Sequence, residues 1–341
     1  MNEDKKYKFS VVIIIYNSEL WIKDAIESIV NQSIGMDNIQ LILVDDESTD
    51  SSLDICKQYQ QVYEENIIIL EKKNGGAASS RNYAIPYIKG DYVEFLDGDD
   101  FISTNTLENV YDFFEKHKKE IDIVSIPMQY FEGRTGPHYL NTKFENGDRI
   151  INLNENYSDI FVHVNSIFIK NELAKKFRFD ETLPTCEDGK MAIQLLLENP
   201  QYGVINNCQY NYRLRKDAKS SLSQIAKRNK AWYIDQMINY PLWSYKYCYD
   251  KLGYIPDFVK TMVASHLQWR FKGNTNKYGI LTDEENEKYK ELLQFSLKFI
   301  DDYIIDTLTQ IPEEQKEYMK SLKKQHKEFH NVEKSNDDEE R

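Results

Sequence analysis

The sequence predicts an α/β fold in which a mostly parallel, Rossmann-like sheet is flanked by helices and followed by a helical appendage. Residues 11–15 form a short, continuous, β-branched run, which is typical of a parallel strand buried on both faces. Similar runs alternate with segments of helical spacing, and this alternation implies βαβ units. Beyond Ser223 the strand signal fades and helical periodicity takes over.

The first half of the chain is expected to hold four strands, over residues 8–15, 39–44, 67–70 and 92–96. Helices are expected between them, and Asn17 and Ser18 can cap the first while Asp50 can cap the second. The third helix should end or kink near Ile85, because Pro86 follows it.

Further elements are expected downstream of these strands. A helix over 105–117 and a strand over 121–130 should follow, and then a polar segment over 133–147 whose Gly and Pro residues indicate a loop or small hairpin. Another helix should span 188–198 and end before Pro200.

The length of 341 residues allows about two domains. We predict an α/β domain over 1–223, a helical appendage over 224–330, and a tail over 331–341 that is disordered or marks the point where a longer chain was cut. In the appendage, Thr282 and Glu285 have the spacing of a capping box.

Composition excludes some partners. Lys plus Arg number 43 and Asp plus Glu 56, so the formal net charge is −13 and a nucleic-acid backbone would be repelled. The four cysteines are far apart, which favours a reducing, cytosolic compartment. No apolar stretch approaches the roughly 18–20 residues of a membrane span, so we expect a cytoplasmic protein, at most peripheral at the inner face of the plasma membrane.

Four acidic or anion-binding features fall at the predicted carboxyl edge of the sheet, where parallel sheets bind ligands. Asp45 and Asp46 could accept hydrogen bonds from a nucleobase or ribose, or serve as turn and cap residues. Gly75 and Gly76 enter a helix, so their N–H groups could approach an anion, with Arg81 adding a bidentate phosphate contact. The pattern is neither a Walker loop nor a GxGxxG motif.

The other two features are carboxylate clusters. Asp97, Asp99 and Asp100 would repel one another without a cation among them, and carboxylates suit octahedral Mg²⁺ or Mn²⁺. Asp99 is the better metal ligand, while Asp100 could equally be an N-cap or surface residue. Glu187 and Asp188 start a helix, where they could cap it or supply the base that a displacement at a sugar carbon requires.

In their order and approximate spacing, these motifs resemble the family 2 inverting glycosyltransferases, which have a GT-A fold, and the resemblance covers residues 8–222. It implies transfer of a sugar from a UDP-sugar to a hydroxyl group with inversion. Asp99 would then hold Mn²⁺ or Mg²⁺, and Asp188 would be the general base with Glu187 beside it. The residues that would hold the donor nucleotide are Tyr16, Asn17, Glu19, Asp46, Asn74, Gly76, Arg81 and Asp97.

A narrower resemblance lies in residues 210–221 and 230–233. This stretch is similar to the segment that closes the site in enzymes that glycosylate teichoic acids or build related Gram-positive wall and capsule polymers. Arg213, Arg215 and Ser221 would clamp the leaving diphosphate, since guanidinium groups stabilise the charge that develops there. An exposed basic loop is the alternative.

On the acceptor side, His163 stands where the family often has Trp, so an aromatic platform is not expected. His163 and Asn165 are candidate acceptor contacts, with a packed surface role as the alternative for His163. The expected partners are a UDP-sugar and a polyol-phosphate or glycan acceptor. Peripheral membrane association and self-association through the appendage stay open, because its Trp232, Trp243 and Trp269 could be core, oligomer contact or acceptor surface.

Two other functions compete with a hexosyl- or N-acetylhexosaminyltransferase. An inactive GT-A scaffold would position a partner, but it has no need to keep like charges together. A nucleotidyltransferase shares the sheet and the metal requirement, but it would need a loop richer in Gly and basic residues than 74–81.

Overall fold

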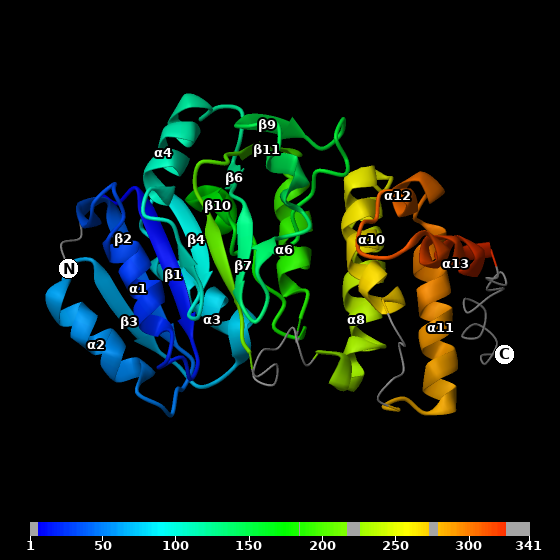
Figure 1. The fold of residues 1–341 in the computed structure, drawn as a ribbon, viewed down its shortest axis with the longest axis horizontal. Coiled ribbons are helices and arrows are strands. Elements are labelled where there is room, and N and C mark those ends of the chain that lie inside the picture. Colours follow the sequence, from blue (N-terminus) through cyan, green and yellow to red (C-terminus); the bar gives the residue numbers. More distant parts are fainter. Residues whose placement is uncertain (1–5, 184, 217–225, 273–278, 325–341) are drawn as a thin grey trace, which may run out of the picture.

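The computed structural model describes residues 6–183, 185–216, 226–272 and 279–324. An eight-stranded sheet of order β3-β2-β1-β4-β10-β6-β11-β9 lies beside a four-stranded sheet of order β5-β12-β7-β8 (Figure 1). The strands of the large sheet are β1 (Phe9–Ile15), β2 (Ile39–Asp45), β3 (Ile67–Glu71), β4 (Tyr92–Asp97), β6 (Ile123–Ser125), β9 (Arg149–Asn152), β10 (Ile167–Lys170) and β11 (Gln201–Val204). Those of the small sheet are β5 (Phe101–Ile102), β7 (Met128–Glu132), β8 (Gly136–Pro137) and β12 (Tyr210–Leu214).

The large sheet is parallel in the half that the β-branched runs form. β3, β2, β1 and β4 pair in parallel, and β2 is buried along its whole length. In the other half, β10 is antiparallel to β4 and β6, and β9 is antiparallel to β11. The predicted α/β fold with a mostly parallel sheet is therefore confirmed, with antiparallel additions at one side.

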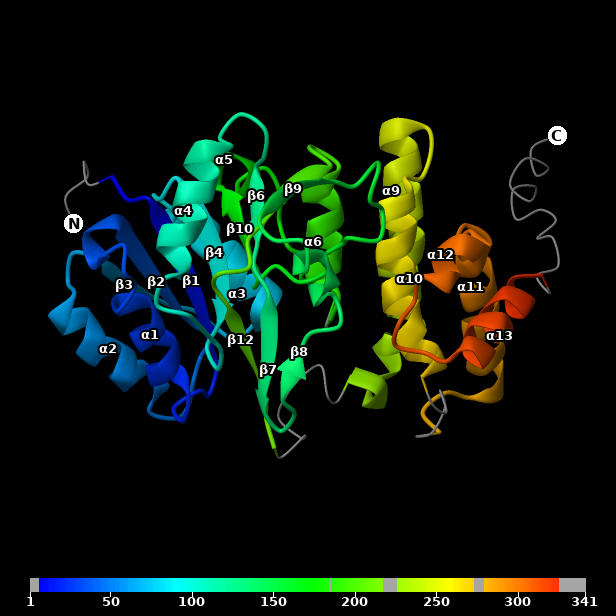
Figure 2. The same ribbon diagram turned by 45° about the horizontal axis from the view of Figure 1, so that its top comes forward.

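Helices cover both faces of this sheet and bury two hydrophobic cores (Figure 2). One face packs against α1 (Ile22–Val30), α2 (Ser52–Val62) and α4 (Thr106–Lys116), and the other packs against α3 (Gly76–Ala84), α5 (Asn171–Ala174) and α6 (Glu187–Leu196). α3 ends at a 3₁₀ turn that contains Pro86, which confirms the predicted break. The first helix is not capped by the side chain of Asn17 or Ser18, because Trp21 is its N-cap residue.

The strand predicted over 121–130 is wrong as a single element. It divides at Pro127 into β6 and β7, which belong to different sheets. Proline lacks the N–H that a continuous ladder requires, so the chain changes sheets there. The expected turn region over 133–147 contains β8, which pairs antiparallel with β7 to form a small hairpin.

All the regular elements described beyond residue 226 are helical. The α-helices are α8 (Asp235–Met237), α9 (Trp243–Leu252), α10 (Asp257–Phe271), α11 (Asp283–Lys298), α12 (Asp302–Asp306) and α13 (Glu313–Lys324). The capping box of Thr282 and Glu285 is present at α11. These helices enclose a third hydrophobic core that includes Trp232, whereas Trp243 and Trp269 are only partly buried.

Among the described residues, no helix has both the length and the apolar character needed to cross a membrane. Cys56, Cys186, Cys208 and Cys248 are all free thiols. Ser221 and the tail over 331–341 lie outside the described residues.

Candidate active site

Parallel pairing brings the predicted acidic residues to one edge of the large sheet. At the carboxyl end of β1, Ile15 is level with Asp45 of β2, and Ile14 is level with Asp97 of β4. The backbone N–H of Asp46 donates to the carbonyl of Ile15 at 2.8 Å, which ties the two strand ends together. The first and third acidic features therefore meet where the sequence predicted them.

The glycine turn binds an anion that belongs to the protein itself. The N–H groups of Gly75 and Gly76 donate to the Asp46 carboxylate at 3.0 and 2.8 Å, and Lys72 Nζ lies 2.6 Å from it. Gly76 has a φ of +82°, a conformation that favours glycine. The expected anion cradle is thus occupied by Asp46, which leaves these N–H groups paired before any ligand arrives.

The predicted nucleotide contacts near β1 lie in a loop cross-linked to the one after β2. Asn17 Oδ1 accepts from the N–H of Thr49 at 2.8 Å, and Glu19 Oε2 accepts from that of Ser51 at 3.0 Å. Asn74 donates through Nδ2 to the Asp46 carbonyl at 3.1 Å. Tyr16 is 52% exposed and can stack on a ligand.

Arg81 gathers three carboxylates from two elements. Its Nη1 lies 3.0 Å from Glu187 Oε1 and 2.9 Å from Asp188 Oδ1, and its Nη2 lies 3.0 Å from Asp97 Oδ1. The Arg81 side chain is only 3% exposed. α3 thus turns the guanidinium toward the carboxylates at the end of β4 and the start of α6, and a contact between Arg81 and a phosphate stays a prediction.

These contacts set the charge of the cluster. Burial alone would lower the pKa of Arg81, but Asp188, Asp97 and Glu187 outweigh it and raise that pKa, so the guanidinium stays charged. Burial and the adjacent Asp188 raise the pKa of Glu187 to about 7, against the attraction of Arg81. Near neutral pH Glu187 can therefore hold a proton within the cluster.

The carboxylates after β4 have three different environments. Asp97 accepts from Asn165 Nδ2 at 3.4 Å in addition to its pair with Arg81. Asp99 Oδ2 lies 2.8 Å from Arg215. Asp100 is fully buried, where it accepts from the hydroxyl of Tyr210 at 2.6 Å, so it is neither a surface residue nor exposed to a ligand.

Arg213 and Arg215, the two arginines of the later basic segment, do not lie in an exposed loop. Arg213 lies in β12, is buried, and contacts Asp24, Glu132 and the backbone carbonyl of Asp99. Its guanidinium joins β12 to the loop after β4 in this structure, and its role as a diphosphate clamp stays a prediction. Arg215 stays at the site, where it pairs with Asp99.

The candidate acceptor residues lie next to the carboxylates. Asn165 is buried beside Asp97. His163 is half-buried and its ring packs against that of His138 with centroids 5.2 Å apart, and burial lowers its pKa. The packed role of His163 is therefore observed, and an acceptor contact stays a prediction.

Sequence reasoning missed Gln236 and His266, which come from the appendage and touch the residues just before Glu187. Gln236 Nε2 lies 3.0 Å from Cys186 Sγ, and His266 Nδ1 lies 3.1 Å from the same sulfur. Fifty or more residues separate these partners, so no local motif could have indicated the contact.

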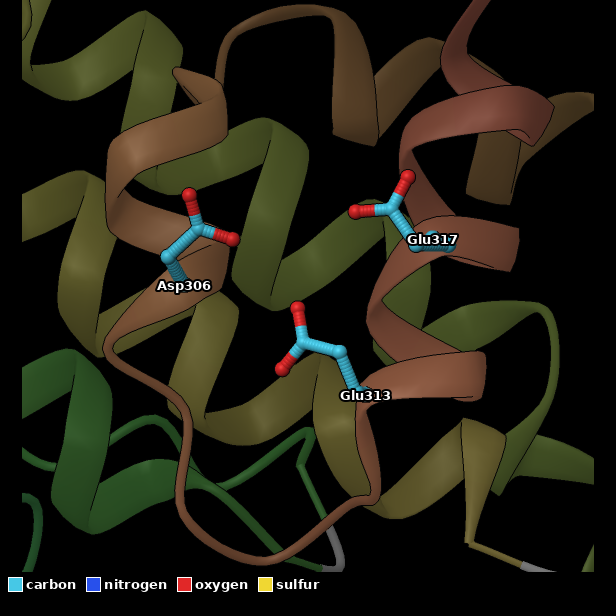
Figure 3. A group of neighbouring side chains, drawn as sticks. All are labelled: Asp306, Glu313 and Glu317. Atoms are coloured by element: carbon cyan, nitrogen blue, oxygen red, sulfur yellow. The ribbon is translucent and has the colours of Figure 1, made fainter.

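The donor chemistry at the sheet edge fits a divalent cation. Asp97 and Asp99 present hard carboxylate oxygens, the ligands that Mg²⁺ and Mn²⁺ prefer. In the described part of the chain, the only group of three clustered metal-ligating side chains lies elsewhere, at Asp306, Glu313 and Glu317 (Figure 3). Asp306 and Glu317 already pair with Lys320, and Glu313 pairs with Lys316, so the cluster is explained without an ion.

Comparison with known proteins places this architecture in a family. The family model described as glycosyl transferase family 2 matches residues 10–177. The minor teichoic acid biosynthesis protein GgaB of Bacillus subtilis (strain 168) is 42% identical over 306 residues, which make up 89% of this chain but 34% of that protein. The chain thus spans about a third of the length of GgaB.

The matches to a second relative and to a solved structure cover a larger share of the other protein. The minor teichoic acid biosynthesis protein GgaA of the same organism is 32% identical over 334 residues, which are 94% of this chain and 72% of that protein. The crystal structure of S. aureus TarS 1–349 in complex with UDP-GlcNAc matches with a TM-score of 0.70 and 21% identity, covering 92% of this chain and 88% of that one. The chain belongs to glycosyl transferase family 2.

Proposed function

We propose that the chain transfers a sugar from a UDP-sugar to a hydroxyl group of a cell-surface polymer such as a teichoic acid. The observation that carries this proposal is the convergence of Asp97, Glu187 and Asp188 on Arg81, at the sheet edge that also holds Asp46 and Asp99. The relatives named for teichoic acid biosynthesis and the UDP-GlcNAc complex of TarS support the choice of donor and acceptor class. Residues 1–223 would be the catalytic domain.

In this proposal Asp188 is the general base. Its Oδ1 is fixed by Arg81, and Oδ2 is the oxygen that we assign to the proton of the acceptor hydroxyl. The acceptor oxygen then attacks the anomeric carbon from the side opposite the diphosphate, which inverts the configuration without a covalent intermediate. Asp97 lies on the other side of Arg81, where it would orient the donor.

A Mn²⁺ or Mg²⁺ ion would be held by Asp99, with Asp97 nearby. When bound, it would neutralise the charge that develops on the diphosphate leaving group. Arg215 pairs with Asp99 in this structure, so it lies where a second positive charge can stabilise the same group.

The test is a donor screen by thermal shift and product release. UDP, UDP-Glc, UDP-GlcNAc, UDP-Gal, GDP-Man and CDP-glycerol are compared, each with Mn²⁺ and with EDTA. We expect stabilisation by uridine nucleotides that requires the metal, and slow release of UDP from one UDP-sugar. The Asp99→Asn variant should lose the part of the thermal stabilisation that depends on the metal, while the matched control Asp306→Asn should keep it. A response to no nucleotide would contradict the proposal, and release of pyrophosphate from a nucleoside triphosphate would favour a nucleotidyltransferase.

A further inference from the structure

The appendage makes direct contact with the segment that carries the proposed base. Cys186 is the N-cap residue of α6 and immediately precedes Glu187 and Asp188. Its φ of 75° and ψ of 7° are left-handed, a conformation that residues other than glycine rarely adopt. Such a conformation persists only where neighbouring groups hold it.

One neighbouring group is the side chain of Gln236 in α8, which is 1% exposed. Its Nε2 donates to the carbonyl of Thr185 at 3.1 Å and lies 3.0 Å from Cys186 Sγ. Its Oε1 accepts from Arg270 Nη2 at 2.8 Å. Because arginine can only donate, this bond fixes the orientation of the amide and leaves Nε2 facing the Thr185–Cys186 turn.

His266 in α10 holds the same turn from a second helix. Its Nε2 lies 3.2 Å from Arg270 Nη2, so Nε2 must accept and Nδ1 must carry the proton. Nδ1 then donates to Cys186 Sγ at 3.1 Å. Arg270 thus sets the donor direction at both Gln236 and His266.

Arg270 is fully buried at the centre of this network. Its guanidinium stacks on the ring of Trp232, with 4.0 Å to the centroid. None of the ion pairs among the described residues includes Arg270. Its polar contacts therefore hold neighbouring side chains in place and do not neutralise a charge. Both Nη groups of Arg270 are bonded in this network, while its Nε has no hydrogen-bond partner among the described residues.

We propose that Gln236 is a positioning residue that the appendage contributes to the active site. The Gln236 side chain holds the Thr185–Cys186 turn, in which Cys186 has the left-handed conformation. This conformation directs Glu187 and Asp188 toward Arg81. This inference rests on the function proposed above. It gives the helical appendage a part in the reaction, because the α/β domain by itself lacks Gln236, His266 and Arg270.

The test compares two buried glutamines of the appendage in the full chain. Gln268 in α10 is also 1% exposed, but its bonds go to Ser265 and Gln310, within the appendage. We expect Gln236→Leu to lower kcat for sugar transfer about tenfold or more with KM for the UDP-sugar changed less than about threefold, since a small displacement of a catalytic group has effects of this size. Gln268→Leu should leave both constants unchanged.

Hydrogen–deuterium exchange of residues 185–190 provides a readout that does not depend on activity. It should rise in Gln236→Leu and stay unchanged in Gln268→Leu. Gln236→Asn, which keeps the amide but shortens its reach, is the second variant if Gln236→Leu does not fold. Equal kcat and equal exchange in the two leucine variants would overturn the inference. A wild type that transfers no sugar would instead overturn the proposed function, and the exchange data would still decide the positioning role.

Discussion

Arg81 carries one positive charge into a buried site that holds three carboxylates. Removal of one member of a buried ion pair is strongly destabilising, because the partners stay desolvated without compensation. We therefore expect Arg81→Ala to lower the free energy of unfolding by about 3–5 kcal/mol, measured by urea denaturation at pH 7. Arg81→Lys should recover only part of this loss, since a single ammonium cannot reproduce the guanidinium's contacts. Wild-type stability in Arg81→Ala would contradict the role of Arg81 as the hub.

Glu94 is a fully buried acid outside this cluster. It lies in the middle of β4 with no exposed surface, and within the described structure neither of its carboxylate oxygens has a hydrogen-bond partner. Burial raises its pKa well above the ordinary value of 4.5.

This predicts a pH dependence with a definite sign. A raised pKa means that the folded state binds the proton more tightly, so the protein is most stable below pH 4.5 with respect to this group and loses stability as pH rises. Glu94→Gln cannot ionise. We expect the difference in unfolding free energy between variant and wild type to grow in favour of Glu94→Gln above pH 5, by up to about 1.4 kcal/mol per pH unit. A difference that does not change between pH 5 and pH 8 would contradict this assignment.

At the level of single residues, the position of the site could be predicted from the sequence better than the contacts within it. Asp46 and Asp97 lie at the predicted edge because a parallel sheet brings strand ends together. The partners of Arg81 and Arg213 could not be predicted, since each depends on how α6 or β12 packs against the sheet. Arginine is a common phosphate ligand, yet the guanidinium groups of both residues contact carboxylates of the protein.

Among the elements, β1 and β4 position the acidic cluster through their close approach. Gly98 follows β4, and its N–H donates to the carbonyl of Ile14 at 3.1 Å. A Cβ at Gly98 would lie 2.7 Å from that carbonyl oxygen. Any side chain here must push the ends of the two strands apart.

The matched pair Gly98→Ala and Gly90→Ala tests this geometry. Gly90 precedes β4 at the opposite end, where a Cβ would meet the backbone of Phe9 and Ser10 within 3 Å. Each variant should lower the free energy of unfolding by about 1–3 kcal/mol or more, which is the usual cost of overpacking. Only Gly98→Ala should also weaken UDP binding, by about tenfold in isothermal titration. Equal UDP affinity in the two variants would show that the strand ends do not position the donor site.

The elements that sequence reasoning missed are short and depend on distant partners. β9, β10 and β11 have four residues each, and their register is set by pairing across the sheet. Such strands carry little periodicity of their own. Longer elements with local signals were predicted well: the β-branched strands β1 and β2, the break of α3 at Pro86 and the capping box at Thr282.

At the scale of the whole molecule, an α/β domain and a helical appendage with its own core meet at the start of α6. The described strands end at Leu214 and the described elements from Ala226 onward are helical, so a boundary at residue 223 stays a prediction. The network of Gln236 and His266 joins the two parts. We propose that this assembly transfers a sugar with Asp188 as the base.

The most direct measurement is transfer from the UDP-sugar found in the donor screen to a polyol-phosphate acceptor, by wild type and Asp188→Asn, with the exposed Asp112→Asn as control. We expect an inverted product from wild type and Asp112→Asn. Asp188→Asn should be slower by about 10²–10⁴-fold, the contribution of a general base, with UDP affinity within about threefold of wild type. Turnover by Asp188→Asn close to that of the wild type would show that Asp188 is not the base.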